Sequence, residues 1–319
     1  MIASVLPTYN RAPLEFVKGE GSWLFEADGR RFLDLGSGIA VNALGHAHPK
    51  LVEVLSTQAQ TLWHVSNLYR IPQQEKLADL LVDLRGRECR HLCCSGTEAC
   101  ELAVKMARKY FYEKNQPERV EIITFDGSFH GRSSAGIAAA GTEKMVKGFG
   151  PLLPGFVHLT FGDMDGLTNA ISAQTAAVLI EPIQGEGGIR PVPDAEMKAL
   201  RQICDDAGIL LILDEVQCGV GRTGRFFAHE WAGITPDIMM VAKGIGGGFP
   251  LGAVLATEEA ASGMTAGTHG STYGGNPLGC AVGCAVVETV MAPGFLEDVN
   301  RKAGLLRQKL EGLLAAHPE

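Results

Sequence analysis

The sequence lacks several features that would assign its class at once. Its 28 Lys and Arg residues are outnumbered by 36 Asp and Glu, and a net charge of −8 with no basic patch argues against a nucleic-acid partner. The eight cysteines contain no Cys-x-x-Cys pair, so zinc spacing is absent, and we interpret them as reduced thiols. The histidines of the Gly45-His-Ala-His-Pro49 turn have no third ligand nearby in sequence, so we expect no metal site.

Long apolar runs are absent as well. The small-residue stretch at 277–287 is too short and too rich in glycine to span a bilayer, and no charged-then-apolar leader opens the chain. We therefore expect a cytoplasmic protein with no membrane partner. With 46% hydrophobic residues over 319 positions, the chain can bury a large core and hold more than one domain.

Glycine is abundant, and it clusters where short apolar runs end. Apolar runs alternate with helical patterns and show no period of two, which predicts an α/β fold with a mainly parallel sheet covered on both faces. Ligands bind at the carboxyl ends of such strands. The residues expected at that edge are Phe129, Glu186, Asp214 and Lys243.

Lys243 follows a buried run at 238–242 and precedes a glycine-rich loop. A lysine at the mouth of a buried strand is costly to desolvate, and desolvation lowers its pKa and leaves a nucleophilic amine. The plain alternative is a strand-end lysine that points into water. Asp214 and Glu215 likewise end an apolar run, and alone they could be a cap or a pair of solvated carboxylates.

A capping box stands at Ser95-Gly-Thr-Glu98, after a short buried strand at 92–94 and before a long amphipathic helix. It is either a well-capped helix or a phosphate site, because free backbone N–H groups at a helix N-terminus bind anions. A different motif, Gly219-Val-Gly-Arg-Thr-Gly224, matches the G-x-G-x-x-G pattern of dinucleotide binding. That pattern should open a helix, and no helical pattern begins at Gly224.

Together the strand ends supply a phosphate cradle, an aromatic ring, a carboxylate and a lysine, which are the groups that pyridoxal phosphate needs. The chain resembles the class III aminotransferases of the fold type I pyridoxal-phosphate enzymes, and among them it is most similar to acetylornithine aminotransferases. The resemblance runs nearly end to end. Its motifs are Ser95-Gly-Thr-Glu-Ala99, Phe129-His-Gly-Arg132, Glu181-Pro-Ile-Gln-Gly-Glu-Gly-Gly188, Asp214-Glu-Val-Gln217 and Ala242-Lys-Gly244; the narrower assignment uses His64-Val-Ser-Asn-Leu-Tyr69.

The resemblance implies a role for each residue of the cofactor site. Lys243 would bind the cofactor as an imine and carry the proton, and Asp214 would pair with the pyridine nitrogen. Val216 and Phe129 would contact the two faces of the ring, and Gln217 would contact its phenolic oxygen. The phosphate would be held by Ser95, Gly96 and Thr97.

The resemblance also implies a homodimer with a shared active site, in which Thr272 reaches the phosphate across the interface. Arg132 and Ser271 would bind the substrate, with Arg132 taking its carboxylate, and Glu186 would help to select the substrate. Cys94 departs from the asparagine that is common in relatives.

The implied reaction moves the terminal amine of N-acetylornithine, or of a similar acylated diamino acid, to 2-oxoglutarate in arginine biosynthesis. The alternatives are another ω-aminotransferase, acting on ornithine, succinylornithine or 4-aminobutyrate, an inactive cofactor-binding fragment, and a nicotinamide oxidoreductase that uses the glycine motif. We expect an N-terminal segment at 1–54 with a hairpin around the Asp28-Gly29 turn, a large pyridoxal-phosphate-binding domain at 55–288, and the start of a truncated C-terminal subdomain at 289–319.

Overall fold

The computed structural model describes residues 4–83 and 89–317, apart from the side chains of Cys89 and Arg90. A small antiparallel sheet opens it, made of β1 (Phe16–Glu20), β2 (Trp23–Glu26) and β3 (Arg31–Leu33). The turn between β2 and β3 contains Asp28 and Gly29, and Gly29 has a φ of 88°, which glycine adopts without strain. The hairpin expected from this Asp-Gly pair is confirmed.

The centre of the fold is a seven-stranded sheet in the order β4-β12-β11-β10-β7-β5-β6. The run from β11 to β6 is parallel, as expected, and β12 is antiparallel to both of its neighbours. The strands are β4 (Cys89–Cys93), β5 (Glu121–Phe125), β6 (Phe156–Leu159), β7 (Thr175–Ile180), β10 (Leu210–Asp214), β11 (Ile238–Val241) and β12 (Gly252–Ala256).

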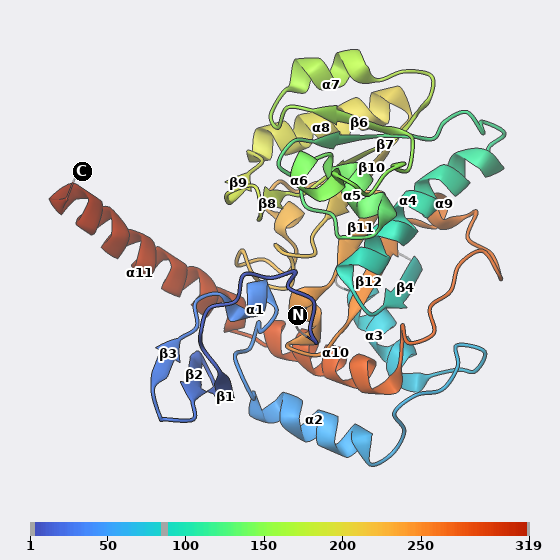
Figure 1. Cartoon of the computed structure of the whole chain (residues 1–319). Coiled ribbons are helices and arrows are strands. Elements are labelled where there is room, and N and C mark those ends of the chain that lie inside the picture. Colours follow the sequence, from blue (N-terminus) through green and yellow to red (C-terminus); the bar gives the residue numbers. More distant parts are fainter. Residues whose placement is uncertain (1–3, 84–88, 318–319) are drawn as a thin grey trace.

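Both faces of this sheet are covered, which explains why its strands show no polar–apolar alternation. Every residue of β7 is buried, with Val178 and Ile180 in one hydrophobic cluster and Ala177 and Leu179 in the other. Figure 1 shows the helices on either side of the sheet. One side carries α4 (Gly96–Glu113), α5 (Ser134–Ala140) and α9 (Glu258–Ala261), and the other α2 (Pro49–Ala59), α3 (Pro72–Asp83), α7 (Met164–Ala170), α8 (Asp194–Ala207) and α10 (Pro277–Val290).

Short elements connect these layers. A 3₁₀ turn, η2, starts at Lys243 directly after β11, and a second, η1, lies beyond the turn that follows β10. No helix opens at Gly224, so the glycine motif there lies in a turn, as expected. The remaining elements are α1 (Ser37–Ala40), α6 (Glu143–Val146), β8 (Ile183–Gln184), β9 (Arg190–Pro191), η1 (Ala228–Glu230) and η2 (Lys243–Gly246).

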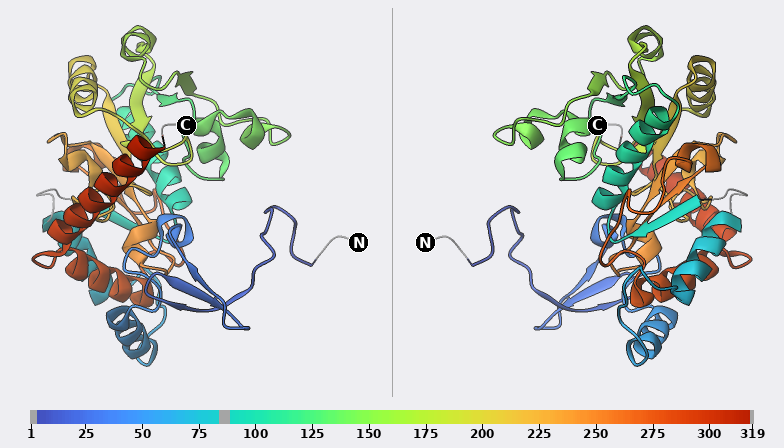
Figure 2. Two further views of the ribbon diagram at one scale, coloured as in Figure 1. Left: turned by 90° about the vertical axis from the view of Figure 1, so that its left-hand side faces the viewer. Right: turned by 90° about the vertical axis from the view of Figure 1, so that its right-hand side faces the viewer.

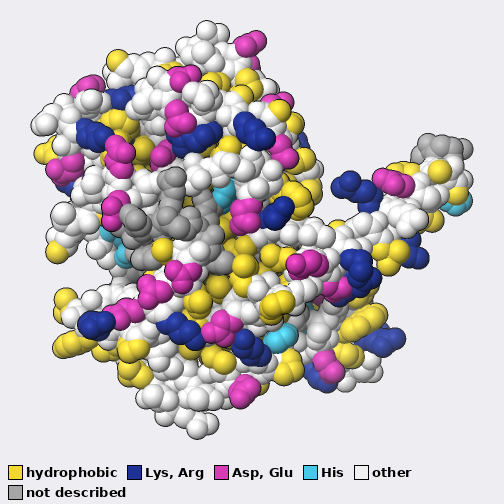
Figure 3. Space-filling model, turned by 180° about the vertical axis from the view of Figure 1, so that it is seen from behind, with side chains coloured by type: hydrophobic (Ala, Val, Ile, Leu, Met, Phe, Trp, Pro, Cys, Tyr) yellow, Lys and Arg dark blue, Asp and Glu magenta, His cyan; other side chains and the backbone are white. Residues whose placement is uncertain are grey.

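The last helix, α11 (Phe295–Ala316), projects from the body in Figure 1, and Figure 2 shows it in front of the body in one view and behind it in the other. It has no buried residue, and Leu306 and Leu314 are exposed along it; Figure 3 shows it standing clear of the rest of the molecule. No single described helix is long and apolar enough to cross a membrane, although α10 and α11 together, bent by 67°, satisfy that test. The proposed division of the chain near residues 54 and 288 stays a prediction.

Candidate active site

A cavity of about 360 Å³ opens where the central strands end. It brings together nine of the twelve residues that the sequence singled out, although they come from five separate stretches of the chain. This confirms that Lys243 and Asp214 face one space. The nine are Ser95, Gly96, Thr97, Phe129, Glu186, Asp214, Val216, Gln217 and Lys243.

The first wall is the N-terminus of α4. Ser95 is the N-cap, and its hydroxyl accepts the Glu98 backbone N–H at 3.2 Å, as the capping box predicts. The reciprocal bond differs from the expected one, because the Glu98 carboxylate accepts the N–H of Cys94 at 2.6 Å. The first N–H groups of a helix have no partner within it, so those of Gly96 and Thr97 can face an anion in the cavity.

Gly96 is required by close packing. A Cβ added there would lie 2.7 Å from Cγ1 of Val216, the residue expected on one face of the cofactor ring. The helix N-terminus and the end of β10 therefore meet without a side chain between them. Gly96 and Val216 therefore form one continuous part of the cavity wall.

Asp214 is 4% exposed and belongs to a buried pair. One carboxylate oxygen lies 2.8 Å from Nδ1 of His130, and the other accepts the Val216 N–H at 3.0 Å. Because an ionised carboxylate only accepts, Nδ1 donates. Nε2 of His130 is buried and has no hydrogen-bond partner among the described residues. Buried polar atoms are rarely left unpaired, so this atom marks a place for a further group.

Lys243 is half-buried and follows β11 after one residue. Its φ of 49° lies in the left-handed region, a strained conformation that clusters at functional sites. Burial lowers the pKa of Lys243, whereas the carboxylates of Asp214, Glu186 and Glu181 act in the opposite direction. The net lowering makes the neutral amine more accessible near neutral pH, as expected for a nucleophilic lysine.

The substrate side is lined by Glu186 and Gln217. Nε2 of Gln217 donates to Oε1 of Glu186 at 3.4 Å, which joins the β8 turn to the end of β10. Arg132 does not line the cavity, but its guanidinium lies 5.3 Å from the ring centre of Phe129, which does. This cation is exposed, so its hydrogen-bond donors can reach an incoming carboxylate.

Ser271 and Thr272 lie away from the cavity. The Ser271 hydroxyl donates to Glu98 at 3.2 Å and accepts the Gly274 N–H at 3.0 Å, and Thr272 is exposed. Within one chain they are not brought to the cofactor space. Their expected roles in substrate binding and across a dimer interface stay predictions.

Sequence reasoning missed several residues of the cavity. His130 and Glu181 lie inside recognised motifs, yet nothing in the sequence assigned them a function. Glu181 is 4% exposed, and burial together with the charge of Asp214 raises its pKa to about 7, against the opposing effect of His130. The other missed residues are Val41, Cys94, Gly131, Ala242, Gly248, Phe249, Pro250 and Leu251.

These residues fit pyridoxal phosphate. The helix N-terminus suits its phosphate, Val216 and Phe129 on the cavity wall suit its ring, and Asp214 and Lys243 suit its ring nitrogen and aldehyde. The unpaired Nε2 of His130 supports a site completed by a ligand. No group of three metal-ligating side chains occurs in the described part of the chain, and its seven described cysteines are free.

Comparison with known proteins agrees with this fit. The family model for class-III aminotransferases matches residues 6–319. The acetylornithine aminotransferase of Rhodobacter capsulatus is 73% identical over 319 residues, which are 100% of this chain and 81% of that protein. The acetylornithine aminotransferase of Mesorhizobium japonicum is 57% identical over 317 residues, or 99% of this chain and 79% of that one.

Solved structures share the fold as well. The ornithine aminotransferase of Toxoplasma gondii superimposes with a TM-score of 0.92 at 30% identity, covering 96% of this chain and 74% of that one. The N-acetylornithine aminotransferase of Stenotrophomonas maltophilia gives 0.83 at 37% identity, covering 97% and 77%. The seven-stranded sheet and its helices are therefore those of a fold type I enzyme. The chain belongs to the class-III aminotransferases, a family of pyridoxal-phosphate-dependent transaminases, and has their fold.

Proposed function

We propose that this aminotransferase moves the terminal amine of N-acetylornithine, or of a similar acylated diamino acid, to 2-oxoglutarate, as a step in arginine biosynthesis. The observation that carries the proposal is the single cavity that Lys243 and Asp214 share beside the N-terminus of α4. The choice of donor is supported by relatives named acetylornithine aminotransferases, at 73% and 57% identity.

The cofactor supplies the electronic chemistry. When bound, pyridoxal phosphate provides an aldehyde that takes up amines and a ring that accepts electron density from the reacting carbon. Asp214 holds a proton at the ring nitrogen, and His130 orients Asp214 through the 2.8 Å contact. Gly96 and Thr97 hold the phosphate with backbone N–H groups, assisted by Ser95. Val216 and Phe129 flank the ring, and Gln217 contacts its phenolic oxygen.

Lys243 acts twice. Its neutral amine would be the nucleophile that holds the cofactor, and once released, Nζ would accept a proton from the substrate carbon and donate it again. The lowered pKa of Lys243 supports both steps, since each needs Nζ without its third proton.

Substrate recognition is proposed for three further residues. Arg132 receives a substrate carboxylate in a two-pronged contact, and Ser271 assists it. Glu186, held by Gln217, influences which amino donor is accepted. Thr272 completes the phosphate site of a second copy in a homodimer, consistent with its exposure outside the cavity of its own chain. The free cysteines support a reducing compartment, and we propose the cytoplasm.

A second candidate donor is ornithine, because the ornithine aminotransferase of Toxoplasma gondii has a closely similar fold. The deciding experiment compares N-acetylornithine, succinylornithine, ornithine and 4-aminobutyrate as donors to 2-oxoglutarate, with glutamate measured as product. We expect the highest kcat/KM with N-acetylornithine. A higher kcat/KM with unacylated ornithine would overturn the proposed donor, and no transfer from any of the four would overturn the proposed reaction.

A further inference from the structure

Glu181 lies in the wall of the cavity that Lys243 and Asp214 share. It follows directly after β7, the strand between β10, which ends at Asp214, and β5, which leads to Phe129. Its side chain is almost fully buried and lines the cavity. A carboxylate in such a position is costly unless it has partners.

Both carboxylate oxygens of Glu181 have backbone partners on different loops. Oε1 accepts the N–H of Phe129 at 2.7 Å, and Oε2 accepts the N–H of Gly185 at 3.1 Å. Phe129 itself lines the cavity, and Gly185 precedes the cavity residue Glu186. One side chain therefore connects the loop after β5 to the turn after β8.

We propose that Glu181 is a positioning residue of the transamination site, whose ionised carboxylate fixes the Phe129 loop and the Gly185–Glu186 turn relative to each other across the cavity. This rests on the roles proposed above for Phe129 and Glu186 and adds a residue that controls them together. Hydrogen bonds to a charged acceptor are short and strong, and only the ionised form offers two full acceptors.

The groups around Glu181 make its two hydrogen bonds sensitive to pH. Glu181 faces Asp214 and His130, and its charge also acts on Lys243 and on the thiol of Cys218. Burial and the charge of Asp214 raise the pKa of Glu181 to about 7, so its carboxyl titrates near neutral pH. Protonation turns one oxygen into a hydroxyl, which weakens the hold on one of the two loops.

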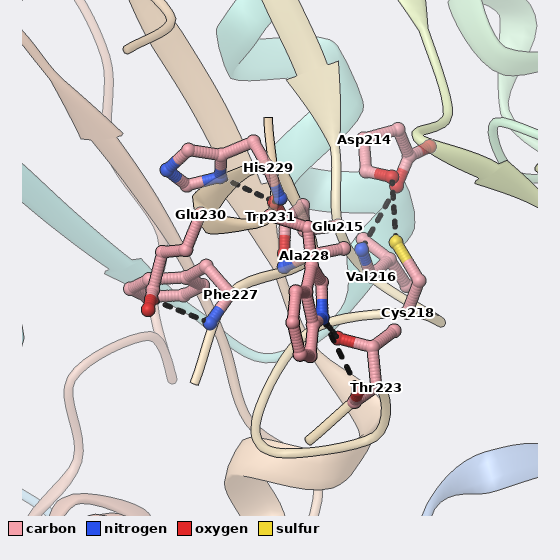
Figure 4. A network of polar contacts seen from close by, with 10 residues as sticks. All are labelled: Asp214, Glu215, Val216, Cys218, Thr223, Phe227, Ala228, His229, Glu230 and Trp231. Carbon is pink, nitrogen blue, oxygen red and sulfur yellow. Dashed lines mark hydrogen bonds and ion pairs between the residues drawn. The ribbon is translucent and has the colours of Figure 1, made fainter. Parts of the chain in front are cut away.

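Glu181→Gln tests the proposal because it mimics the protonated form, with one amide oxygen and one NH₂ group that cannot accept. Glu215→Gln is the matched control. Glu215 is also fully buried and also accepts two backbone N–H groups, from Ala228 at 2.6 Å and His229 at 2.9 Å, but it does not line the cavity. Figure 4 shows this second network.

The first readout is hydrogen exchange in the chain without cofactor, corrected for intrinsic rates. At pH 8 we expect the segments around Phe129 and Gly185 to exchange about tenfold faster in Glu181→Gln than in wild type, and to be unchanged in Glu215→Gln. In wild type, lowering the pH from 8 to 6 should accelerate the same two segments, because their N–H groups lose a charged acceptor in a local opening that leaves Glu181 buried. This pH comparison needs neither substrate nor variant. Equal protection of both segments in wild type and Glu181→Gln would overturn the proposal, as would protection in wild type that does not change with pH.

The second readout is the pH profile of transamination by the loaded enzyme. We expect kcat/KM of Glu181→Gln to fall about tenfold at pH 8.5 and less than about twofold at pH 6, where wild-type Glu181 is itself protonated. A loss of equal size at both pH values would mean that Glu181 serves only stability and would contradict the proposal. Hydrogen exchange is measured on the chain without cofactor or substrate, so its result does not depend on which substrate the enzyme uses. The proposal for Glu181 can therefore fail or hold independently of the proposed substrate.

Discussion

Asp214 and Glu215 are neighbours at the end of β10, and each pairs with a histidine, yet their surroundings differ completely. Successive side chains of a strand point to opposite sides, so Asp214 faces the cavity with His130 and Glu215 faces the interior with His229. In the Glu215–His229 pair, the carboxylate also accepts the backbone N–H groups of Ala228 and His229. In the Asp214–His130 pair, Nε2 of His130 has no hydrogen-bond partner among the described residues. The second pair can therefore bind a further group in the cavity, and the first serves the interior.

The largest effect that separates the two pairs should come from Asp214→Asn. The amide keeps the size of the side chain but cannot hold a proton at the cofactor ring nitrogen. We expect kcat to fall by about 10²- to 10³-fold, the usual cost of removing a preorganised electrostatic partner. Steady-state kinetics with excess cofactor checks this. A kcat within about threefold of wild type would contradict the role of Asp214.

Glu215→Gln should act mainly on stability. The amide oxygen is one acceptor where the carboxylate offers two, so a buried N–H group loses its partner, which costs about 1–3 kcal/mol. We therefore expect a clear loss in the free energy of unfolding, measured by urea titration, and a smaller loss of kcat in the molecules that remain folded. A kcat loss as large as that of Asp214→Asn, with unchanged stability, would remove the distinction between the two sides of β10.

Glu181 extends the comparison to pH. Its pKa is raised in the folded chain from 4.5 to about 7, so the folded state keeps a proton that the unfolded state releases from pH 4.5 upward. The stability contributed by that proton is present below pH 4.5 and is lost as pH rises through 7, by about 3 kcal/mol in total. Glu181→Gln does not titrate, so its stability relative to wild type should rise across this window. Parallel stability curves for the two proteins would contradict the raised pKa.

Much of this arrangement could be predicted from the sequence, because short apolar runs followed by glycine mark the ends of buried parallel strands. Lys243 and Asp214 were found in this way. His130 and Glu181 were not, because their partners lie 84 and 52 residues away in sequence and only the strand order brings them together. The antiparallel direction of β12 could not be predicted either, because a strand that is buried on both faces has the same apolar pattern in either direction. The role proposed for Thr272 needs a second copy of the chain, which no pattern within one chain describes.

The smallest expected effect is on cofactor affinity, and it is tested by comparing substitutions at two glycines. In Gly96→Ala the new Cβ would lie 2.7 Å from Cγ1 of Val216, so one of them must shift. We expect about a tenfold weaker affinity for pyridoxal phosphate, measured by fluorescence titration, because overpacking costs about 1–3 kcal/mol. Gly312→Ala in α11 is the control, since nothing lies within 4 Å of the added Cβ and alanine favours a helix. Equal cofactor affinity in Gly96→Ala and wild type would argue against a phosphate cradle at this helix.

The account depends most on the claim that Lys243 is the amine that holds the cofactor. The direct measurement is to load the chain with pyridoxal phosphate, reduce it with borohydride, digest it and map the modified peptide by mass spectrometry. We predict one pyridoxyl group per chain, on the peptide that contains Lys243, and none in Lys243→Ala. A stable adduct on a different lysine, or modification that survives in Lys243→Ala at the wild-type level, would contradict the site as described.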